Sequence, residues 1–524
     1  MGIYLNPGNT GFQRALNSEI YIDKSGLLRY VNGKLFTEQQ FICVSRPRRF
    51  GKSMAANMLA AYYSRGCDSR EQFAELDIAG ADDFEKHLNK YNVIHLNMAD
   101  FLSESSGLED MLCLIEADIL DELTEEFEQI RLPKRRSLVR MLNAVFDQTK
   151  IPFIFIIDEW DCIFRVHKYQ EDGQTKYLDF LRNIMKDKSY VALAYMTGIL
   201  PIKKYGEHSA LNMFTEVSMA DPREFAEFTG FTEQEVYSLC EAYHMSFEET
   251  RRWYDGYWLR GVSVYNPRSV IMAMTGGYFS NYWTSTETYE ALKVYMEMNF
   301  DGLRDKIIQL IAGGEVAVNT AKFQNDMMTF KSADDILTLL IHLGYLTFDF
   351  DKKTVRIPNG EVQQEFINSI EDGGWENVMK SIHLSEELLD ATLAGDEVKV
   401  AELLEQAHDD NTSILKYNDE NSLSCVISLA YYTAKKKYAV YREMPAGKGF
   451  ADLVFVPGRK TDSPAMIVEL KYEKSVETAM KQIKEKRYMD CLKDYRGEIL
   501  LVGVEYDKNS ETKKHVCRIE KIRK

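Results

Sequence analysis

Two carboxylates and a lysine near the C-terminal end of the chain have the types and spacing that metal-assisted chemistry needs. Glu469 and Lys471 stand two residues apart in the run AMIVELK, and Asp452 stands early in the run FADLVFV. Alternate residues of a strand share one face, so Glu469 and Lys471 are predicted to lie side by side. Carboxylates hold Mg²⁺, which activates water, while a lysine stabilises developing negative charge. The pattern predicts metal-assisted phosphodiester cleavage.

Further side chains could complete this group. Glu420 begins a predicted helix upstream and could add a third carboxylate, and Gln482 and Tyr488 are expected to support the centre from a helix downstream. Mg²⁺, with Mn²⁺ as an alternative, is the expected metal, and Asp452 and Glu469 are its expected ligands. The alternative interpretation is that Glu-Leu-Lys, a common tripeptide, only decorates the surface.

A second group stands in the run SRPRRFGKSM, residues 45–54. It ends in Gly51, Lys52 and Ser53, as a phosphate-binding loop does, but Arg46 stands where G-x-x-x-x-G-K-[ST] has its first glycine. Lys52 would contact the β- and γ-phosphates and Ser53 the metal ion, while backbone N–H groups at a helix start would cradle phosphate. The alternative is a surface loop that ends in GKS by chance.

The run FIFIIDE, residues 153–159, favours the nucleotide-site interpretation, because a buried apolar strand that ends in an acidic residue holds the Mg²⁺ ion of a phosphate loop. Asp158 is expected in that shell, and Glu159 is placed to polarise an attacking water. Thr197 follows the run VALAYM and could sense the γ-phosphate, although an ordinary strand-end threonine is the alternative. ATP is the expected ligand, and its expected contacts are Arg49, Phe50, Gly51, Lys52, Ser53, Met54, Asp158 and Thr197.

The elements around these groups predict an α/β fold. Four apolar, β-prone runs alternate with segments of helical spacing: 40–45, 92–98, 152–161 and 191–202. This alternation predicts a parallel sheet with helices between its strands. The unbroken apolar run at 152–161 suits a central strand that is covered on both faces.

Beyond about residue 215 the pattern changes to a mainly helical middle region. A hairpin at 343–359, with a polar turn at Asp351–Lys353, would make this region winged-helix-like. The aromatic block RRWYDGYW at 251–258 could stack on bases or adenine, but core packing is the favoured interpretation. The last part is expected to run helix, strand, strand, helix, strand. We expect three domains: 1–215, 216–410 and 411–524.

Charge and composition narrow the choice of partners. The 524 residues include 64 Lys and Arg against 81 Asp and Glu, a net charge of −17, but residues 411–524 reverse the balance with 23 against 16. A polyanion would therefore meet the C-terminal part, unless this is only a solvated surface. Eight cysteines without a C-x-x-C pair indicate a reduced, cytoplasmic protein. No apolar run predicts a membrane span or a secretory signal.

The motifs together resemble those of a known family. Residues from about 4 to 300 resemble the AAA-ATPase-like family of bacterial proteins, whose phosphate loop reads R-P-R-R-F-G-K-S, as Arg46 to Ser53 do here. The other matching stretches are YIDKS (21–25), IDEWD (157–161), TGILPI (197–202), WYDGY (253–257) and YNPRSV (265–270). The last part looks like the PD-(D/E)xK nuclease domain usually fused to that ATPase, although Ala451 stands where the PD motif has proline.

The resemblance implies a P-loop NTPase fold followed by a restriction-endonuclease-like fold. It carries over two residue sets, Lys52, Ser53 and Asp158 for nucleotide and magnesium, and Asp452, Glu469 and Lys471 for cleavage. It favours an ATP-dependent or ATP-regulated nuclease acting on DNA rather than RNA, in defence, mobile-element control or repair. The alternative is a nucleotide-gated switch whose nuclease-like domain only binds nucleic acid or a protein. Whether an arginine acts in trans within a homo-oligomer stays open.

Overall fold

The computed structural model describes most of the chain in two compact units. The described residues are 2–131, 133, 136–167, 170–202, 211–283, 288–298, 302–323, 330–371, 376–411, 420–446, 449–457, 463–492, 495–506 and 515–523. The N-terminal unit is Met1–Ser285 with Ala317–Val362, and the C-terminal unit is Thr286–Val316 with Gln363–Lys524. The domain boundaries expected from the sequence stay a prediction.

A five-stranded parallel sheet forms the centre of the N-terminal unit, with strand order β2–β3–β4–β1–β5. The strands are β1 (Phe41–Ser45), β2 (Asn92–Asn97), β3 (Phe153–Asp158), β4 (Val191–Gly198) and β5 (Thr215–Val217). The four runs predicted as strands are β1 to β4, so the predicted parallel α/β fold is confirmed.

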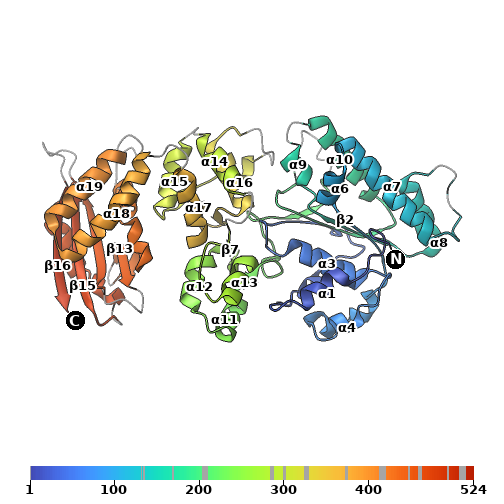
Figure 1. The fold of residues 1–524 in the computed structure, drawn as a ribbon, viewed down its shortest axis with the longest axis horizontal. Coiled ribbons are helices and arrows are strands. Elements are labelled where there is room, and N and C mark those ends of the chain that lie inside the picture. Colours follow the sequence, from blue (N-terminus) through green and yellow to red (C-terminus); the bar gives the residue numbers. More distant parts are fainter. Residues whose placement is uncertain are drawn as a thin grey trace. The chain divides into compact units, whose positions relative to one another are not determined.

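Helices cover both faces of this sheet (Figure 1), with α1 (Thr10–Leu16) and α3 (Lys52–Tyr63) on one face and α6 (Met98–Glu104), α7 (Leu108–Glu126) and α10 (Glu171–Met185) on the other. The strand β3 serves both faces: Phe153, Phe155 and Ile157 pack into one apolar core, and Ile154 and Ile156 into the other. This explains the unbroken apolar run in the sequence. The other helices of this part are α2 (Gly26–Asn32), α4 (Arg70–Phe73), η1 (Asp77–Gly80), α5 (Phe84–His87), α8 (Leu138–Thr149) and α9 (Cys162–Val166).

The rest of the N-terminal unit adds short strands and helices. These are β6 (Phe231–Thr232), α11 (Glu233–Ala242), α12 (Phe247–Tyr254), β7 (Tyr257–Leu259), β8 (Val262–Tyr265), α13 (Pro267–Gly276), α16 (Ala333–Leu343), β10 (Thr347–Asp349) and β11 (Thr354–Arg356). The antiparallel pair β10–β11 confirms the predicted hairpin, while its winged-helix assignment stays a prediction. In the aromatic block Tyr254 and Tyr257 are fully buried, as core packing predicts, and Trp258 is 44% exposed.

A mixed five-stranded sheet forms the centre of the C-terminal unit. Its order is β12–β13–β14–β15–β16, and only the β14–β15 pair is parallel. The strands are β12 (Tyr438–Ala446), β13 (Gly449–Pro457), β14 (Ala465–Tyr472), β15 (Glu498–Tyr506) and β16 (His515–Arg523). The expected element order was wrong in omitting β12 and β16. Both are edge strands whose charged residues interrupt the apolar pattern that marks a central strand.

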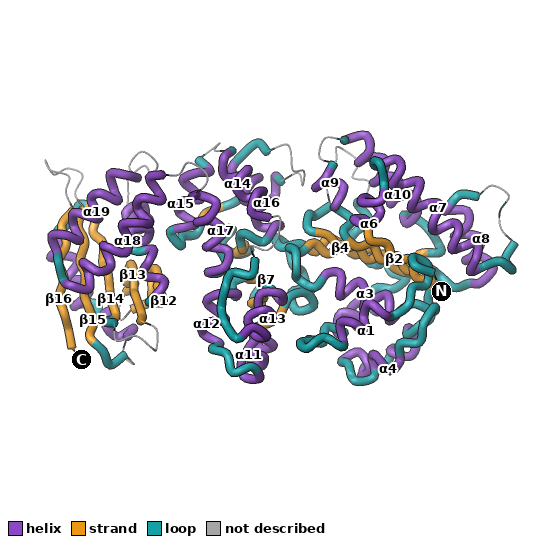
Figure 2. The backbone as a smooth tube through the Cα atoms, viewed as in Figure 1, coloured by secondary structure: helices purple, strands orange, loops and turns teal. Residues whose placement is uncertain are grey.

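The helices α19 (Glu397–Asn411), α20 (Glu420–Ala430) and α21 (Val476–Glu485) pack on this second sheet, and α18 (Glu376–Ala394) packs against α19 (Figure 2). The remaining elements are α14 (Thr288–Glu297), α15 (Leu303–Ile311), β9 (Val316–Ala317), η2 (Thr320–Lys322), α17 (Gly360–Glu371), η3 (Tyr432–Lys436) and η4 (Tyr488–Leu492). In the described part of the chain, no helix is both long and apolar enough to cross a membrane.

The backbone conformation and the close packing at position 256, within the stretch WYDGY, require a glycine. Its φ is +110°, and a Cβ there would lie 2.0 Å from the carbonyl oxygen of Pro358. Gly256→Ala is expected to lower the free energy of unfolding by about 3 kcal/mol, from left-handed strain and overpacking together. Gly261→Ala is the matched control, because Gly261 has a φ of +90° but no atom within 4 Å of such a Cβ. Urea unfolding measures both; equal losses would contradict the packing argument.

Candidate nucleotide and nuclease sites

The phosphate loop joins the end of β1 to the start of α3, which is the context that nucleotide binding requires. Lys52 opens the helix, and first-turn N–H groups have no partner within a helix, so they can bind an anion. Arg49 and Gly51 have φ of +69° and +84°, which turn the loop into the helix. The Lys52 Nζ donates to the Pro47 carbonyl oxygen at 3.0 Å. Burial lowers the pKa of Lys52, although nearby carboxylates oppose this.

Arg46 takes the place of the first glycine, and its side chain has no exposed surface. Its Nε donates to the Thr229 hydroxyl at 3.0 Å and its Nη1 to the Ser45 carbonyl oxygen at 3.1 Å. Its backbone N–H donates to the Gly198 carbonyl oxygen at 3.0 Å. Burial lowers the pKa of Arg46 to about 10. A flexible glycine is thus replaced by a side chain that ties the loop to residue 229.

Residues far along the chain also hold the loop. The Gly230 N–H donates to the Phe50 carbonyl oxygen at 3.1 Å, and the buried Phe50 ring packs edge-on against Tyr257, with 5.1 Å between centroids. Gly344 has a φ of +88°, and a Cβ on it would lie 2.8 Å from the Pro47 side chain. We name these contacts, with the Arg46–Thr229 bond, the loop clamp. The shape of the phosphate loop therefore depends on residues 229 to 344.

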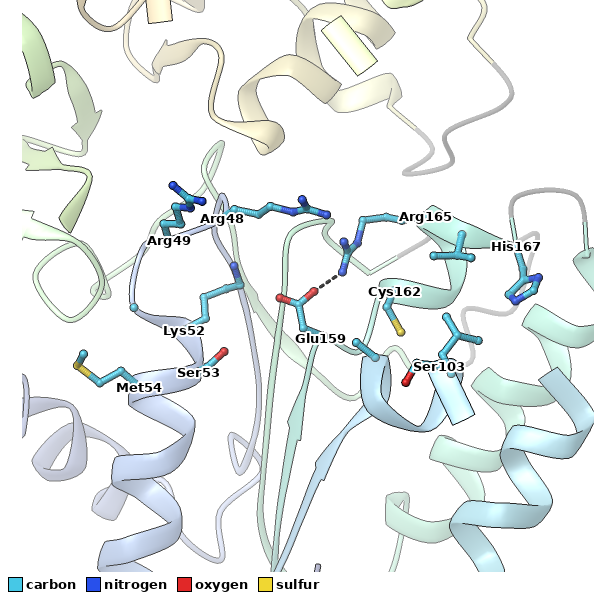
Figure 3. Close-up of a pocket in the computed structure, with 14 residues that line it drawn as sticks. Arg48, Arg49, Lys52, Ser53, Met54, Ser103, Glu159, Cys162, Arg165 and His167 are labelled. Carbon is cyan, nitrogen blue, oxygen red and sulfur yellow. Dashed lines mark hydrogen bonds and ion pairs between the residues drawn. The ribbon is translucent and has the colours of Figure 1, made fainter. Parts of the chain in front are cut away.

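A cavity of about 690 Å³ opens beside the loop, and its wall continues over α6 and α9 (Figure 3). This volume lies within the range of small-molecule sites. Of the residues predicted to contact ATP, the cavity is lined by Arg49, Gly51, Lys52, Ser53 and Met54. Phe50, Asp158 and Thr197 do not line it. The lining beside the loop is cationic, which suits a polyphosphate.

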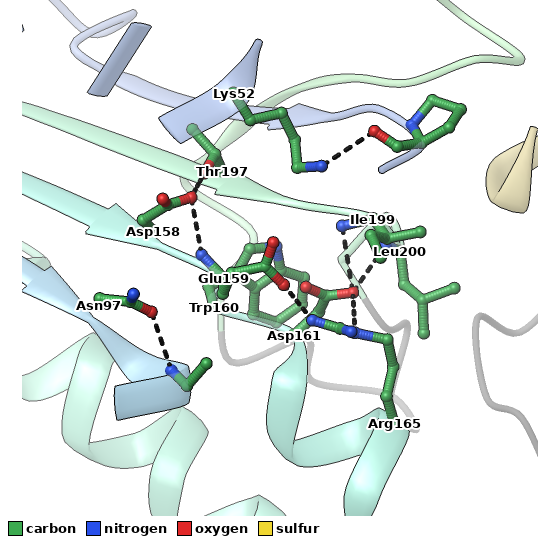
Figure 4. Close-up of polar contacts among 12 residues, drawn as sticks. Lys52, Asn97, Asp158, Glu159, Trp160, Asp161, Arg165, Thr197, Ile199 and Leu200 are labelled. Atoms are coloured by element: carbon green, nitrogen blue, oxygen red, sulfur yellow. Dashed lines mark hydrogen bonds and ion pairs between the residues drawn. The ribbon is translucent and has the colours of Figure 1, made fainter. Parts of the chain in front are cut away.

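Asp158 is the last residue of β3, and Thr197 is the last but one of the adjacent strand β4. Asp158 is 4% exposed, and its Oδ1 accepts hydrogen bonds from the Thr197 hydroxyl and, at 3.0 Å, from the Glu159 N–H (Figure 4). The cavity hydroxyl of Ser53 and this carboxylate are the groups that could hold a metal ion at the loop. The γ-phosphate role expected of Thr197 stays a prediction, since its hydroxyl contacts Asp158.

Glu159 lines the cavity, and its carboxylate forms an ion pair with the Arg165 guanidinium (Figure 4). The Nε of Arg165 lies 3.2 Å from Oδ2 of Asp161. Asp161 has no exposed surface, and the same oxygen accepts from the N–H groups of Ile199 at 3.1 Å and Leu200 at 2.8 Å. Although burial disfavours its charge, Asp161 and Glu159 raise the pKa of Arg165.

Sequence reasoning missed both Arg165 and Asp161. The available signal was the spacing: Asp161 and Arg165 stand four residues apart, which places them on one helical face directly after the acidic strand end. The spacing alone does not show that Glu159 joins them, because that contact depends on how α9 leaves the strand β3.

In the second site, β13 and β14 bring Asp452 beside Glu469. Leu453 pairs with Val468 in the antiparallel ladder, so the next position in this register sets Asp452 opposite Glu469. The Leu470 N–H donates to Oδ2 of Asp452 at 2.7 Å. Ala451, in the place of the PD-motif proline, is fully buried and alternates to the other face of the strand. The predicted carboxylates therefore meet on one sheet face.

Glu469 is the centre of a buried polar network. It is 1% exposed, and its Oε1 accepts from Lys471 Nζ at 2.8 Å and from the Gln482 side-chain amide. That amide also donates to the Tyr488 hydroxyl at 2.9 Å. The structure thus brings Asp452, Glu469, Lys471, Gln482 and Tyr488 together. Glu420 begins α20, but its side chain lies outside the described residues, so its part in the site stays a prediction.

One buried oxygen of the network has no hydrogen-bond partner among the described residues. Burial, and then the Asp452 charge, raise the pKa of Glu469 to about 7, against the effect of Lys471. The other oxygen of Glu469, Oε2, is buried and accepts no hydrogen bond from the described residues, which fits a metal ion as its partner. No set of three or more His, Cys, Asp or Glu side chains that could hold a metal occurs in the described part. The site therefore offers two carboxylates.

Two family models match the chain. Residues 9–206 match a model described as "Predicted AAA-ATPase", and residues 418–516 match one described as "PD-(D/E)XK nuclease superfamily". The chain joins an AAA-ATPase-like domain to a PD-(D/E)XK nuclease superfamily domain. The predicted fusion is confirmed, and the two domains imply nucleotide and divalent-metal use in general. The AAA-ATPase-like domain holds the cavity beside Lys52, and the nuclease superfamily domain holds the Glu469 network.

The individual relatives are distant. A curated protein of Azotobacter chroococcum mcd 1, described as "Uncharacterized protein in vnfD 5'region", is 25% identical over 279 residues, 51% of this chain and 51% of that protein. The chain thus matches about half the length of this relative. A Walker-type ATPase of Pyrococcus abyssi has a TM-score of 0.34 and 14% identity, over 66% of this chain and 94% of that one. Aeropyrum pernix ORC2 has a TM-score of 0.31 and 12% identity, over 70% and 98%. These TM-scores are low, so the fold assignment depends on the family models and the strand order.

Arg46→Gly would restore the ordinary loop spacing, yet it is expected to lower the free energy of unfolding of the AAA-ATPase-like domain by about 2 kcal/mol. Loss of the packed Arg46 side chain lowers this free energy by about 3 kcal/mol, and the extra backbone freedom of glycine in the unfolded chain lowers it by about 1 kcal/mol. Removing a buried guanidinium whose Nη2 has no partner among the described residues returns about 2. Urea unfolding tests this against Arg48→Gly, a half-exposed position of the same loop. A stabilised Arg46→Gly protein would contradict the clamp.

The raised pKa of Glu469 predicts that the stability of the nuclease domain depends on pH. This raised pKa means that the folded protein keeps a proton that the unfolded chain releases near pH 4.5. The stability from this proton is complete below pH 4.5 and is lost as the pH rises through about 7. Relative to Glu469→Gln, the unfolding free energy of the wild type should fall by about 3 kcal/mol between pH 5 and 8. Calorimetry in EDTA measures this, with the exposed Glu477→Gln as control; parallel pH profiles for the wild type and Glu469→Gln would refute it.

Proposed function

We propose that the chain hydrolyses ATP and cleaves nucleic acid with Mg²⁺, and that DNA is the substrate of its nuclease domain. The observation that carries this proposal is the Asp452–Glu469–Lys471 group on one face of the β13–β14 pair, with a buried carboxylate oxygen that has no hydrogen-bond partner among the described residues. A structural glutamate would not need an unpartnered oxygen, because burying one without a bond is costly.

Each residue of the nuclease centre has a part in this proposal. Asp452 and Glu469 would hold the divalent ion, with Mn²⁺ as an alternative to Mg²⁺. When bound, the ion would lower the pKa of water and neutralise charge on the scissile phosphate. Lys471 holds its ammonium 2.8 Å from Oε1 of Glu469 and would stabilise the negative charge of the pentacoordinate transition state. Gln482 fixes Glu469 from α21, and Tyr488 in turn accepts from Gln482.

The nucleotide cavity supports the ATPase half of the proposal. Lys52 and the N–H groups at the start of α3 would bind the β- and γ-phosphates, and Ser53 and Asp158 would hold Mg²⁺. Glu159 is the acidic group on the cavity wall that could polarise the attacking water. ATP turnover would then switch or drive the nuclease. A bacterial cytoplasmic role in defence, mobile-element control or repair is the setting that we propose, and a homo-oligomer stays open.

A second candidate function is a nucleotide-gated switch whose nuclease-like domain binds nucleic acid or a protein without cutting. The observation that favours it is the Lys471–Glu469 ion pair at 2.8 Å, in a site whose described part offers only two carboxylates. A lysine that neutralises one ligand could replace the metal ion. Binding that survives both EDTA and Asp452→Asn, without any cleavage, would select this candidate.

Cleavage assays test the nuclease proposal directly. The full chain is incubated with supercoiled, linear and single-stranded DNA and with RNA, each with Mg²⁺ or Mn²⁺ and with or without ATP. Glu469→Gln should slow cleavage by about 100-fold or more, since it would lose a metal ligand. Gln482→Ala should slow cleavage by about tenfold, since Glu469 would stay but would lose the hydrogen bond that orients it. Glu477→Gln, exposed on the same helix as Gln482, should cut like the wild type. Cleavage that persists in Glu469→Gln would refute the assignment.

A further inference from the structure

Two cations face each other across the nucleotide cavity, with Glu159 between them (Figure 3). Lys52 comes from the start of α3, and Arg165 comes from α9 on the opposite wall. Lys52 donates a hydrogen bond to a loop carbonyl oxygen, and Arg165 forms ion pairs with two carboxylates. A phosphate group can compete with a carboxylate for the Arg165 guanidinium, because the oxygen atoms of both match its planar fork.

The two carboxylates hold Arg165 unequally. Asp161 is fully buried and is fixed by the N–H groups of Ile199 and Leu200, so it cannot follow a moving guanidinium. The Glu159 side chain is 23% exposed and lies on the cavity wall. The Asp161 contact therefore anchors the Nε side of Arg165, and the Glu159 contact is the one that can exchange.

The backbone of Glu159 favours an exchange by side-chain rotation alone. Glu159 has a φ of +53°, and its N–H donates to Asp158 at 3.0 Å. The next N–H, of Trp160, donates to the Thr197 carbonyl oxygen at 3.0 Å. These bonds keep the turn in place on both sides of Glu159. The side chain can leave Arg165 without any change of the strand ends.

We propose that Arg165 binds the γ-phosphate of ATP and thereby releases Glu159 to polarise the attacking water. This inference rests on the proposed ATP hydrolysis. In the step itself, the water oxygen bonds to the γ-phosphorus while the bond from that phosphorus to the β,γ-bridging oxygen breaks. Glu159 takes a proton from the water, and the bridging oxygen leaves with the bonding electron pair as part of ADP. Arg165 carries charge of the transferred group, and Asp161 holds the guanidinium in place.

Nucleotide titration of the full-length protein by calorimetry tests this role without relying on turnover. Arg165→Ala should weaken binding of the non-hydrolysable analogue ADPNP about tenfold or more, the effect of one charge-assisted contact, while ADP affinity changes less than about twofold. Glu159→Gln should strengthen ADPNP binding relative to ADP, because a neutral amide competes less well for the guanidinium. Arg165→Lys keeps the charge but loses the fork, and should fall between Arg165→Ala and the wild type.

Arg251→Ala is the matched control, since Arg251 contacts Asp255 at 3.5 Å with the same four-residue spacing and does not line the cavity. It should leave both affinities unchanged. Equal losses of ADP and ADPNP affinity in Arg165→Ala would show that Arg165 has only a structural role and would overturn the inference. Unchanged affinities for both nucleotides would also overturn it. If Arg165→Ala does not fold, Arg165→Lys carries the same comparison. If the wild type binds neither nucleotide, the proposed ATPase function fails first, and the inference fails with it.

Discussion

A guanidinium buried at the entrance of the phosphate loop sets the conditions for the rest of the N-terminal unit. Arg46 has no exposed surface and no carboxylate partner among the described residues, so its charge must be met by neutral oxygen atoms. Thr229 and Ser45 supply them, which forces residues beyond β5 against the loop. Phe50 and Pro47 then pack on the same region. The nucleotide cavity is therefore built on the whole unit, not on the parallel sheet alone.

The two sites solve a similar electrostatic problem. In each, an acidic residue with a proposed role in hydrolysis is held by a cation of the chain itself, Glu159 by Arg165 and Glu469 by Lys471. Burial and the Asp452 charge favour the protonated form of Glu469 and raise its pKa, and Lys471 opposes this rise. The internal cation keeps each carboxylate oriented, and a phosphate group would compete for that same cation. If both proposals hold, substrate binding would loosen the cation's hold on the carboxylate in both domains.

The sequence predicted what short-range rules determine. Strand parity was enough to place Glu469 and Lys471 on one face, and unbroken apolar runs were enough to find the strands β1 to β4. The edge strands β12 and β16 were not predicted, because an edge strand tolerates charged residues that break the apolar pattern of a central strand. The Glu159–Arg165 ion pair was not predicted for a different reason. It depends on the direction in which α9 leaves a left-handed turn, and no spacing rule gives that direction.

The loop clamp also fixes an order of events during synthesis. The strands β1 to β4 are complete at residue 198, but the clamp partners of Arg46 and Pro47 are Thr229 and Gly344. At the usual speed of translation, the ribosome needs roughly 7 to 30 s to reach residue 344 from that point. Until then the loop clamp lacks the contact between Pro47 and Gly344, although Thr229 and Gly230 have already been made. Gly344 still precedes Asp452, so the finished nucleotide site leaves the ribosome before the nuclease centre does.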